Sequence, residues 1–283
     1  MSRSIVRTIM KNDLTNDLTK AAENLSYYRY LLPFGKTPEK KFVVLMHPRS
    51  GSTLLNHLLR RSPDIHCDGE FLMRRVLAPH LYAEARSRKA KKPIYGFKMT
   101  SWQITTKQRL ASPRQLVLRL HDQGWQIIYL ERNNILRQSM SLLFAKHKQA
   151  LEPGKRGLFH HRASQGPLRL EKIHVDCDLL RWYTENRERE MEDSRQALVD
   201  LPHLSLVYEE DLLRAEDHQR TADRIFDYLG AARVEVATDL VRTSTDRLAD
   251  MIDNYDEVVS VLADTKYAAM LDDHSQESTL QVA

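Results

Sequence analysis

The feature that most constrains this chain is a short apolar run that leads through a glycine-containing loop into a leucine-rich stretch. Residues 42–46 read Phe-Val-Val-Leu-Met, and residues 47–53 read His-Pro-Arg-Ser-Gly-Ser-Thr. An unbroken apolar run of this length is typical of a strand buried on both faces of a parallel sheet. Leucines at helical spacing between Ser52 and Arg61 predict an amphipathic helix directly after the loop. A strand, a tight loop and a helix in this order aim the backbone N–H groups of residues 50–54 at one point, which predicts an anion-binding site.

Further short apolar runs alternate with helical stretches along the chain. Strands are predicted at residues 94–97, 126–130 and 204–208, and helices at residues 135–146, 176–198, 222–229 and 246–262. This alternation predicts an α/β fold of three layers, with a central, mostly parallel β-sheet flanked by helices and right-handed crossovers. The segment 152–170 is rich in glycine and proline and is expected to be a long irregular loop.

Composition narrows the class of protein. The 283 residues include 43 Lys+Arg and 38 Asp+Glu, a formal charge of +5, with 42% hydrophobic and 29% charged residues. This profile is typical of a globular chain and excludes a disordered one. The mild charge is compatible with an anionic ligand and gives no argument for nucleic acid. We see no apolar run long enough for a transmembrane segment, no secretory signal and only two cysteines, so a cytoplasmic protein is expected.

The loop at residues 47–53 carries its own chemistry. Gly51 lets the backbone approach an oxyanion, and Arg49 adds a planar fork of donors with a fixed charge. No Gly-Lys-Ser or Gly-Lys-Thr follows, so the loop is not that of an NTPase. An ordinary strand–turn–helix with capping hydroxyl groups on Ser52 and Thr53 is the alternative.

The stretch Pro48–Leu54 resembles the 5′-phosphosulfate loop of sulfotransferases that use 3′-phosphoadenosine 5′-phosphosulfate (PAPS), in particular the bacterial carbohydrate enzymes of the nodulation-factor and trehalose types. The resemblance implies a P-loop-NTPase-like sulfotransferase fold. It also implies that the phosphosulfate is held by Arg49, Ser50, Gly51, Ser52, Thr53 and Leu54.

The same resemblance implies a second anchor, for the 3′-phosphate of PAPS. Residues 132–141 fit the R-x-x-x-L-R-Q-x-x-S pattern of the bacterial subgroup, which assigns Arg132 and Ser141 to this role in preference to Ser139. An arginine supplies the charge-assisted pair that a dianionic phosphate needs, and a hydroxyl group completes it. The alternative is that Arg132 is a surface charge and Ser141 an ordinary helix residue.

A hydroxyl acceptor loses a proton as it attacks sulfur, so a base is needed. By resemblance, Glu70 in the stretch after the first helix takes this role, with His66, Asp68 and His47 as rivals. The resemblance also gives Lys98 a catalytic role on the leaving or acceptor side, against the alternative of a lysine at the surface end of a strand.

The sequence as a whole predicts one sulfotransferase domain over residues 1–283, with residues 1–38 as a helical extension of unassigned role. The expected reaction transfers a sulfuryl group from PAPS to a carbohydrate, glycolipid or small-metabolite hydroxyl and yields 3′-phosphoadenosine 5′-phosphate (PAP). We expect no metal, because no metal-ligand spacing occurs. The alternatives are a nucleotide or small-molecule kinase with an atypical P-loop and a catalytically silent nucleotide-binding protein. The oligomeric state stays open, a homodimer included.

Overall fold

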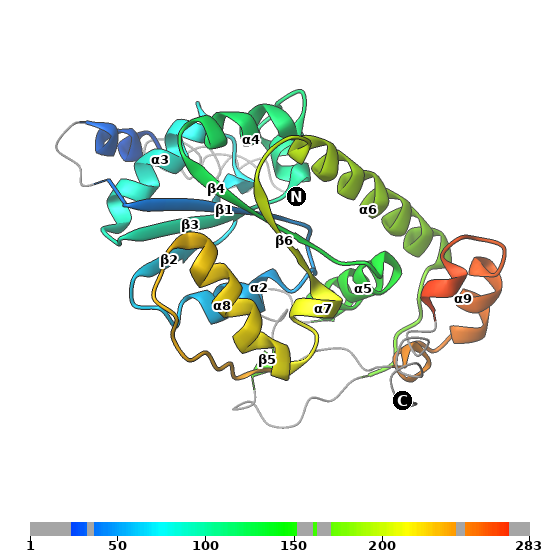
Figure 1. Ribbon diagram of the computed structural model, residues 1–283. Helices are drawn as coiled ribbons and strands as arrows, with labels where there is room; N and C mark the ends of the chain where they lie inside the picture. Colours follow the sequence, from blue (N-terminus) through cyan, green and yellow to red (C-terminus); the bar gives the residue numbers. More distant parts are fainter. Residues whose placement is uncertain (1–23, 33–36, 152–160, 163–170, 242–246, 272–283) are drawn as a thin grey trace, which may run out of the picture.

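The computed structural model describes residues 24–32, 37–151, 161–162, 171–241 and 247–271 (Figure 1). Most of the loop expected at residues 152–170 lies outside these ranges, as does most of the expected extension at residues 1–38. Within that extension, Tyr28–Leu31 forms a 3-10 turn, η1.

A five-stranded parallel sheet forms the centre of the molecule. Its strands are β1 (Lys40–Met46), β2 (Ile65–Asp68), β3 (Ile94–Met99), β4 (Trp125–Glu131) and β6 (His203–Val207), in the order β2-β3-β1-β4-β6. A separate antiparallel pair joins β5 (His161–Arg162) to β7 (Leu240–Val241). The predicted α/β fold is confirmed, and β2 is a strand that the sequence analysis did not include.

Helices cover both faces of this sheet, which completes the predicted three layers. One face of β1 packs against α2 (Ser52–Leu59) and α8 (His218–Leu229). The other face packs against α3 (Pro79–Ala90), α4 (Pro113–Asp122) and the end of α6 (Cys177–Leu198). Figure 1 shows these two groups of helices on opposite sides of the strands. The central position of β1, between β3 and β4, explains why its apolar run is continuous.

A third apolar cluster lies beyond the ends of β1 and β4. It joins α5 (Ile135–Leu151), the part of α6 up to Met191 and α9 (Tyr255–Leu262), together with the short turns η6 (Leu248–Asp250) and η7 (Ala268–Met270). The remaining short elements are η2 (Phe71–Met73), η3 (Gln103–Lys107), α7 (Tyr208–Asp211) and η5 (Ala215–Asp217). In the described part of the chain, every helix is too short or too polar to span a bilayer.

Close packing inside the sheet explains why residue 96, two positions before Lys98, is a glycine. A Cβ atom on Gly96 would lie 2.2 Å from the ring of Phe42 on the neighbouring strand. Only glycine leaves room for that ring, and the ring fills the space between β3 and α2.

Candidate functional site

The loop between β1 and α2 has the geometry of an anion site. Arg49 and Gly51 both adopt the left-handed backbone conformation, with φ of 68° and 86°. For a non-glycine residue this conformation is uncommon and costs energy, and it is typical of functional loops. The hydroxyl group of Ser50 donates to His47 O at 2.7 Å and closes the turn.

Helix α2 begins without a side-chain cap. Gly51 is its N-cap residue, and the first bond of the helix runs from Leu55 N–H to Gly51 O at 3.0 Å. The N–H groups of Ser52, Thr53 and Leu54 precede that bond and have no backbone or side-chain acceptor among the described residues. They form the cradle of donors that the sequence predicts, with the helix dipole behind it.

The segment after β6 holds this loop in place. A Cβ atom on Gly51 would lie 2.6 Å from Tyr208 Cδ2, so the Tyr208 ring packs directly on the glycine. The same ring stacks under the Arg132 guanidinium, whose Cζ lies 4.5 Å from the ring centroid. The sequence analysis did not assign Tyr208 to the site, and nothing in its local pattern marks the contact.

The two anchors predicted from the sequence meet in space. Arg49 Nε donates to Ser141 Oγ at 3.0 Å, and the Arg132 guanidinium donates to Arg49 O at 3.3 Å. Gln138 on α5 donates to Pro48 O at 2.8 Å and ties the helix to the loop. The structure therefore brings Ser141, the preferred serine, to the first loop. Ser139 is buried and its hydroxyl group has no partner among the described residues.

Charge is concentrated where the anchors meet. Burial lowers the pKa of Arg49, and the like charge of Arg132 lowers it further. Arg132 is 6% exposed, and its Nε lies 3.5 Å from Glu209 Oε1. The Glu209 carboxylate also accepts hydrogen bonds from the backbone N–H groups of Asn133 at 2.9 Å and Asn134 at 3.2 Å, just before α5 begins. One buried and one partly buried guanidinium group at the same loop favour an anion between them.

Glu70 and Lys98 lie near each other at the other side of the site. Glu70 follows β2 and directly precedes η2, and its Oε2 accepts a hydrogen bond from Gln103 Nε2 at 2.7 Å. Lys98, on β3, is 7% exposed. Burial lowers the pKa of the Lys98 ammonium group, and the neighbouring Glu70 carboxylate opposes part of that shift. Among the described residues, Lys98 Nζ has no hydrogen bond or close ion pair.

The three rivals of Glu70 have other surroundings. Asp68 accepts hydrogen bonds from Tyr95 at 2.6 Å and Arg86 at 2.9 Å, and it pairs with His66 at 2.9 Å. Burial raises the pKa of Asp68, but the Tyr95 hydrogen bond and the Arg86 charge outweigh it and hold the pKa below its ordinary value. His47 is fully buried, and burial lowers its pKa. Asp68 thus has three side-chain partners, His66 among them, whereas Glu70 has one hydrogen bond among the described residues.

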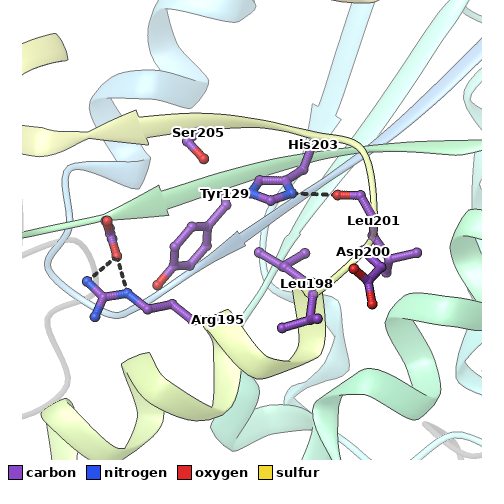
Figure 2. Close-up of a pocket in the computed structure, with 9 residues that line it drawn as sticks. Tyr129, Arg195, Leu198, Asp200, Leu201, His203 and Ser205 are labelled. Carbon is purple, nitrogen blue, oxygen red and sulfur yellow. Dashed lines mark hydrogen bonds and ion pairs between the residues drawn. The ribbon is translucent and has the colours of Figure 1, made fainter.

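A separate pocket opens beside β4 and β6, on the face that α6 covers. Figure 2 shows it lined by Tyr129, Arg195, His203 and Ser205 among others. Its volume is about 390 Å³. Arg195 donates to Glu131 Oε2 through Nε at 3.2 Å and Nη2 at 3.0 Å. None of the residues proposed from the sequence lines this pocket. In the described ranges, no three His, Cys, Asp or Glu side chains gather as a metal ion requires.

No protein-family model matches the chain, and no curated protein matches it in sequence. Among solved structures it is similar to the mouse sulfotransferase SULT7A1 complexed with PAP, at 14% identity over 71% of this chain and 62% of that chain, with a TM-score of 0.40. The alignment thus spans less than two thirds of the mouse protein.

The chain is also similar to two sulfotransferase domains. One is from the curacin biosynthetic pathway, at 13% identity over 69% of this chain and 76% of that chain, with a TM-score of 0.39. The other is from the Synechococcus PCC 7002 olefin synthase, at 17% identity over 89% and 92%, with a TM-score of 0.39. All three structures belong to the family that the sequence motifs resemble. Identities and TM-scores this low carry no argument about function, which has to come from the residues of the site.

Proposed function

We propose that this protein transfers a sulfuryl group from PAPS to a hydroxyl acceptor. One observation carries the proposal: Arg49 and Arg132, 83 residues apart in sequence, meet beside the bare N-terminus of α2. A site for one phosphate needs a single cation and a helix start. Two guanidinium groups at one loop suit a ligand with more than one anionic group, as PAPS has.

The residues present fit such a ligand. Arg49 and the N–H groups of residues 52–54 would hold the phosphosulfate, and Arg132 with Ser141 would hold the 3′-phosphate. Lys98 adds a buried cation that makes no hydrogen bond among the described residues and has the Glu70 carboxylate as a neighbour, so its charge would be available to the departing phosphate. When bound, PAPS supplies the sulfuryl group, and its bisphosphate portion departs as PAP.

Glu70 is the proposed proton acceptor. Its Oε1 atom has no hydrogen-bond partner among the described residues, whereas Oε2 is held by Gln103. Glu70 takes the proton of the acceptor hydroxyl as the oxygen–sulfur bond forms and the bond from sulfur to the bridging oxygen breaks. The negative charge that develops on the phosphate side is stabilised by Arg49, Lys98 and the loop amides, and Glu70 later returns the proton to solvent.

The acceptor would approach past Met73, which is 45% exposed and whose Sδ accepts a hydrogen bond from Gln103 Nε2 at 3.2 Å. Its thioether offers apolar surface near the proposed base, which suits a carbohydrate or glycolipid hydroxyl and also a small metabolite.

Nucleotide binding tests the proposal. Calorimetry should give tight binding of PAP, at least tenfold weaker binding of adenosine 5′-phosphate, and no gain with ATP and Mg²⁺. Mass spectrometry of a hydroxylated metabolite library incubated with PAPS should then give products heavier by one sulfuryl group. Preference for ATP with Mg²⁺ would support the kinase alternative, and PAP binding without any sulfated product would support a silent binding protein.

A further inference from the structure

The Gln103 amide links the start of a helical turn to the Glu70 carboxylate. Gln103 is fully buried. Its Nε2 donates to Glu70 Oε2 at 2.7 Å, and its Oε1 accepts the Thr100 N–H at 3.2 Å. Because the Thr100 N–H can only donate, it requires the amide oxygen on its own side. The amino group is thereby turned toward Glu70.

Residues 100–103, Thr-Ser-Trp-Gln, carry the T-x-x-Q pattern of a helix capping box. The reciprocal bonds are both present, since Gln103 N–H donates to Thr100 Oγ1 at 3.1 Å. The first backbone bond of the turn runs from Ile104 N–H to Thr100 O at 3.3 Å. Such a box uses only an oxygen of its last side chain, so glutamate serves it as well as glutamine.

The cap therefore does not explain why residue 103 is a glutamine. A glutamate there would bring a second negative charge against Glu70, whereas glutamine brings a donor. We propose that Gln103 is a positioning residue for the proton acceptor: its amide holds Oε2 of Glu70, so that Oε1 is left for the acceptor hydroxyl. This inference rests on the proposed function, because it takes Glu70 as the base.

The surroundings of Glu70 leave Gln103 as the residue that fixes it. The charged group that approaches the carboxylate from β3 is Lys98, which makes no hydrogen bond to it. Asp68, two residues earlier, is held by Arg86 and Tyr95. Among the described residues, Gln103 is the hydrogen-bond donor of the Glu70 carboxylate.

The test measures the titration of the Glu70 carboxyl group directly. Protein labelled with ¹³C at the glutamate carboxyl is titrated by NMR, and the Glu70 signal is assigned by its loss in the matching Glu70→Gln variants. Gln103→Glu preserves the cap but places two carboxylates together. We expect the titration midpoint of Glu70 to move up by about one pH unit or more. An unmoved midpoint would show that the side chain at residue 103 does not contact the Glu70 carboxylate, and it would overturn the proposal.

A second variant and a control test whether the shift of the midpoint comes from disruption of the fold instead of loss of the Gln103 donor. Gln103→Met keeps the length of the side chain but removes the donor, so a smaller upward shift is expected. Thr105→Val removes the bond from Thr105 Oγ1 to Ser101 O at 3.1 Å in the same turn, and it should lower Tm without moving the midpoint. A midpoint that moves equally in Thr105→Val would overturn the proposal.

Calorimetry with PAP on the same proteins separates the two proposals. Gln103→Glu should bind PAP as the unsubstituted protein does, because Gln103 contacts neither anchor. If the unsubstituted protein fails to bind PAP while the Glu70 midpoint still moves, the sulfotransferase proposal fails and the positioning of Glu70 stands.

Discussion

The two ends of the candidate site are built in different ways. The phosphate end is made of main-chain N–H groups and of arginines held by neighbours close in the folded chain, as the contacts of Arg49 with Ser141 and Arg132 show. The proton-accepting end is made of side chains alone, with Glu70, Lys98 and Gln103 coming from separate elements. Both ends therefore depend on the assembled fold, but the phosphate end uses main-chain donors that one loop supplies, whereas the proposed proton-accepting end relies on side chains alone.

The largest expected effect comes from a substitution at the proton-accepting end, which should leave nucleotide binding at the phosphate end intact. Glu70→Gln should lower the rate of sulfuryl transfer by about 10²- to 10⁴-fold, because general base catalysis is lost. PAP binding should stay within a factor of about two, since Glu70 touches neither anchor. Transfer of ³⁵S from PAPS and calorimetry measure the two quantities. Near-native turnover of both Glu70→Gln and Glu70→Ala would remove Glu70 from its role.

The next largest effect is expected from a substitution at the first anchor of the phosphate end, Arg49. Arg49→Ala should lower the transfer rate by about 10²- to 10³-fold, as the loss of a preorganised donor does, and should weaken PAP binding as well. Glu70→Gln, by contrast, should leave PAP binding intact, so PAP binding distinguishes the two variants. If Arg49→Ala left PAP binding intact, the two ends would not differ as described.

The second anchor should show selectivity. Arg132→Ala should weaken PAP binding by about 10- to 100-fold, in line with about 1.5–3 kcal/mol for a hydrogen bond to a charged group. Binding of adenosine 5′-phosphate, which lacks the 3′-phosphate, should change much less. Equal losses for the two nucleotides in calorimetry would place Arg132 elsewhere in the ligand.

A smaller effect concerns the backbone of the loop. Gly51→Ala should lower the free energy of unfolding by about 1–2 kcal/mol, because alanine is disfavoured at φ of 86° and its Cβ meets the Tyr208 ring. Urea unfolding measures the loss. Gly69→Ala is the matched control, because a Cβ there meets no atom within 4 Å and φ is not left-handed.

The smallest effect is a gain of stability. Lys98→Met should raise the free energy of unfolding by about 1 kcal/mol at neutral pH while lowering transfer, since a buried charge is replaced by an apolar chain. The pKa of Lys98 is lowered in the folded state, so the unfolded state binds more protons in the alkaline range. The unsubstituted protein should therefore gain stability relative to Lys98→Met as pH rises toward the ordinary lysine pKa. A difference in unfolding free energy between the two proteins that stays constant from about pH 7 to about pH 10 would contradict this prediction.

The sequence signals for the proposed phosphate end are contiguous. The apolar run at residues 42–46 and the loop after it lie within one short stretch, and Arg132 and Ser141 lie on one strand end and the helix that follows. Their convergence follows from the rule that the carboxyl ends of parallel strands share one edge.

The other contacts could not be read from the sequence. Tyr208 reaches Gly51, and Gln103 reaches Glu70, across 157 and 33 positions of the chain. Nothing local distinguishes this capping glutamine from any other, and β2 is too short to stand out by its pattern. Such contacts depend on how the strands are ordered in the sheet, which no short window of residues contains.

Glu209 bears on the proposed release of the product. An anion bound at Arg132 would meet a guanidinium already partly neutralised by a carboxylate 3.5 Å away. The two negative groups would then compete for one guanidinium, which lowers the net gain from binding there. Glu209 is held in place by the N–H groups of Asn133 and Asn134, so it would pair with Arg132 again once the anion departs. In the proposed reaction this pairing would ease departure of the 3′-phosphate.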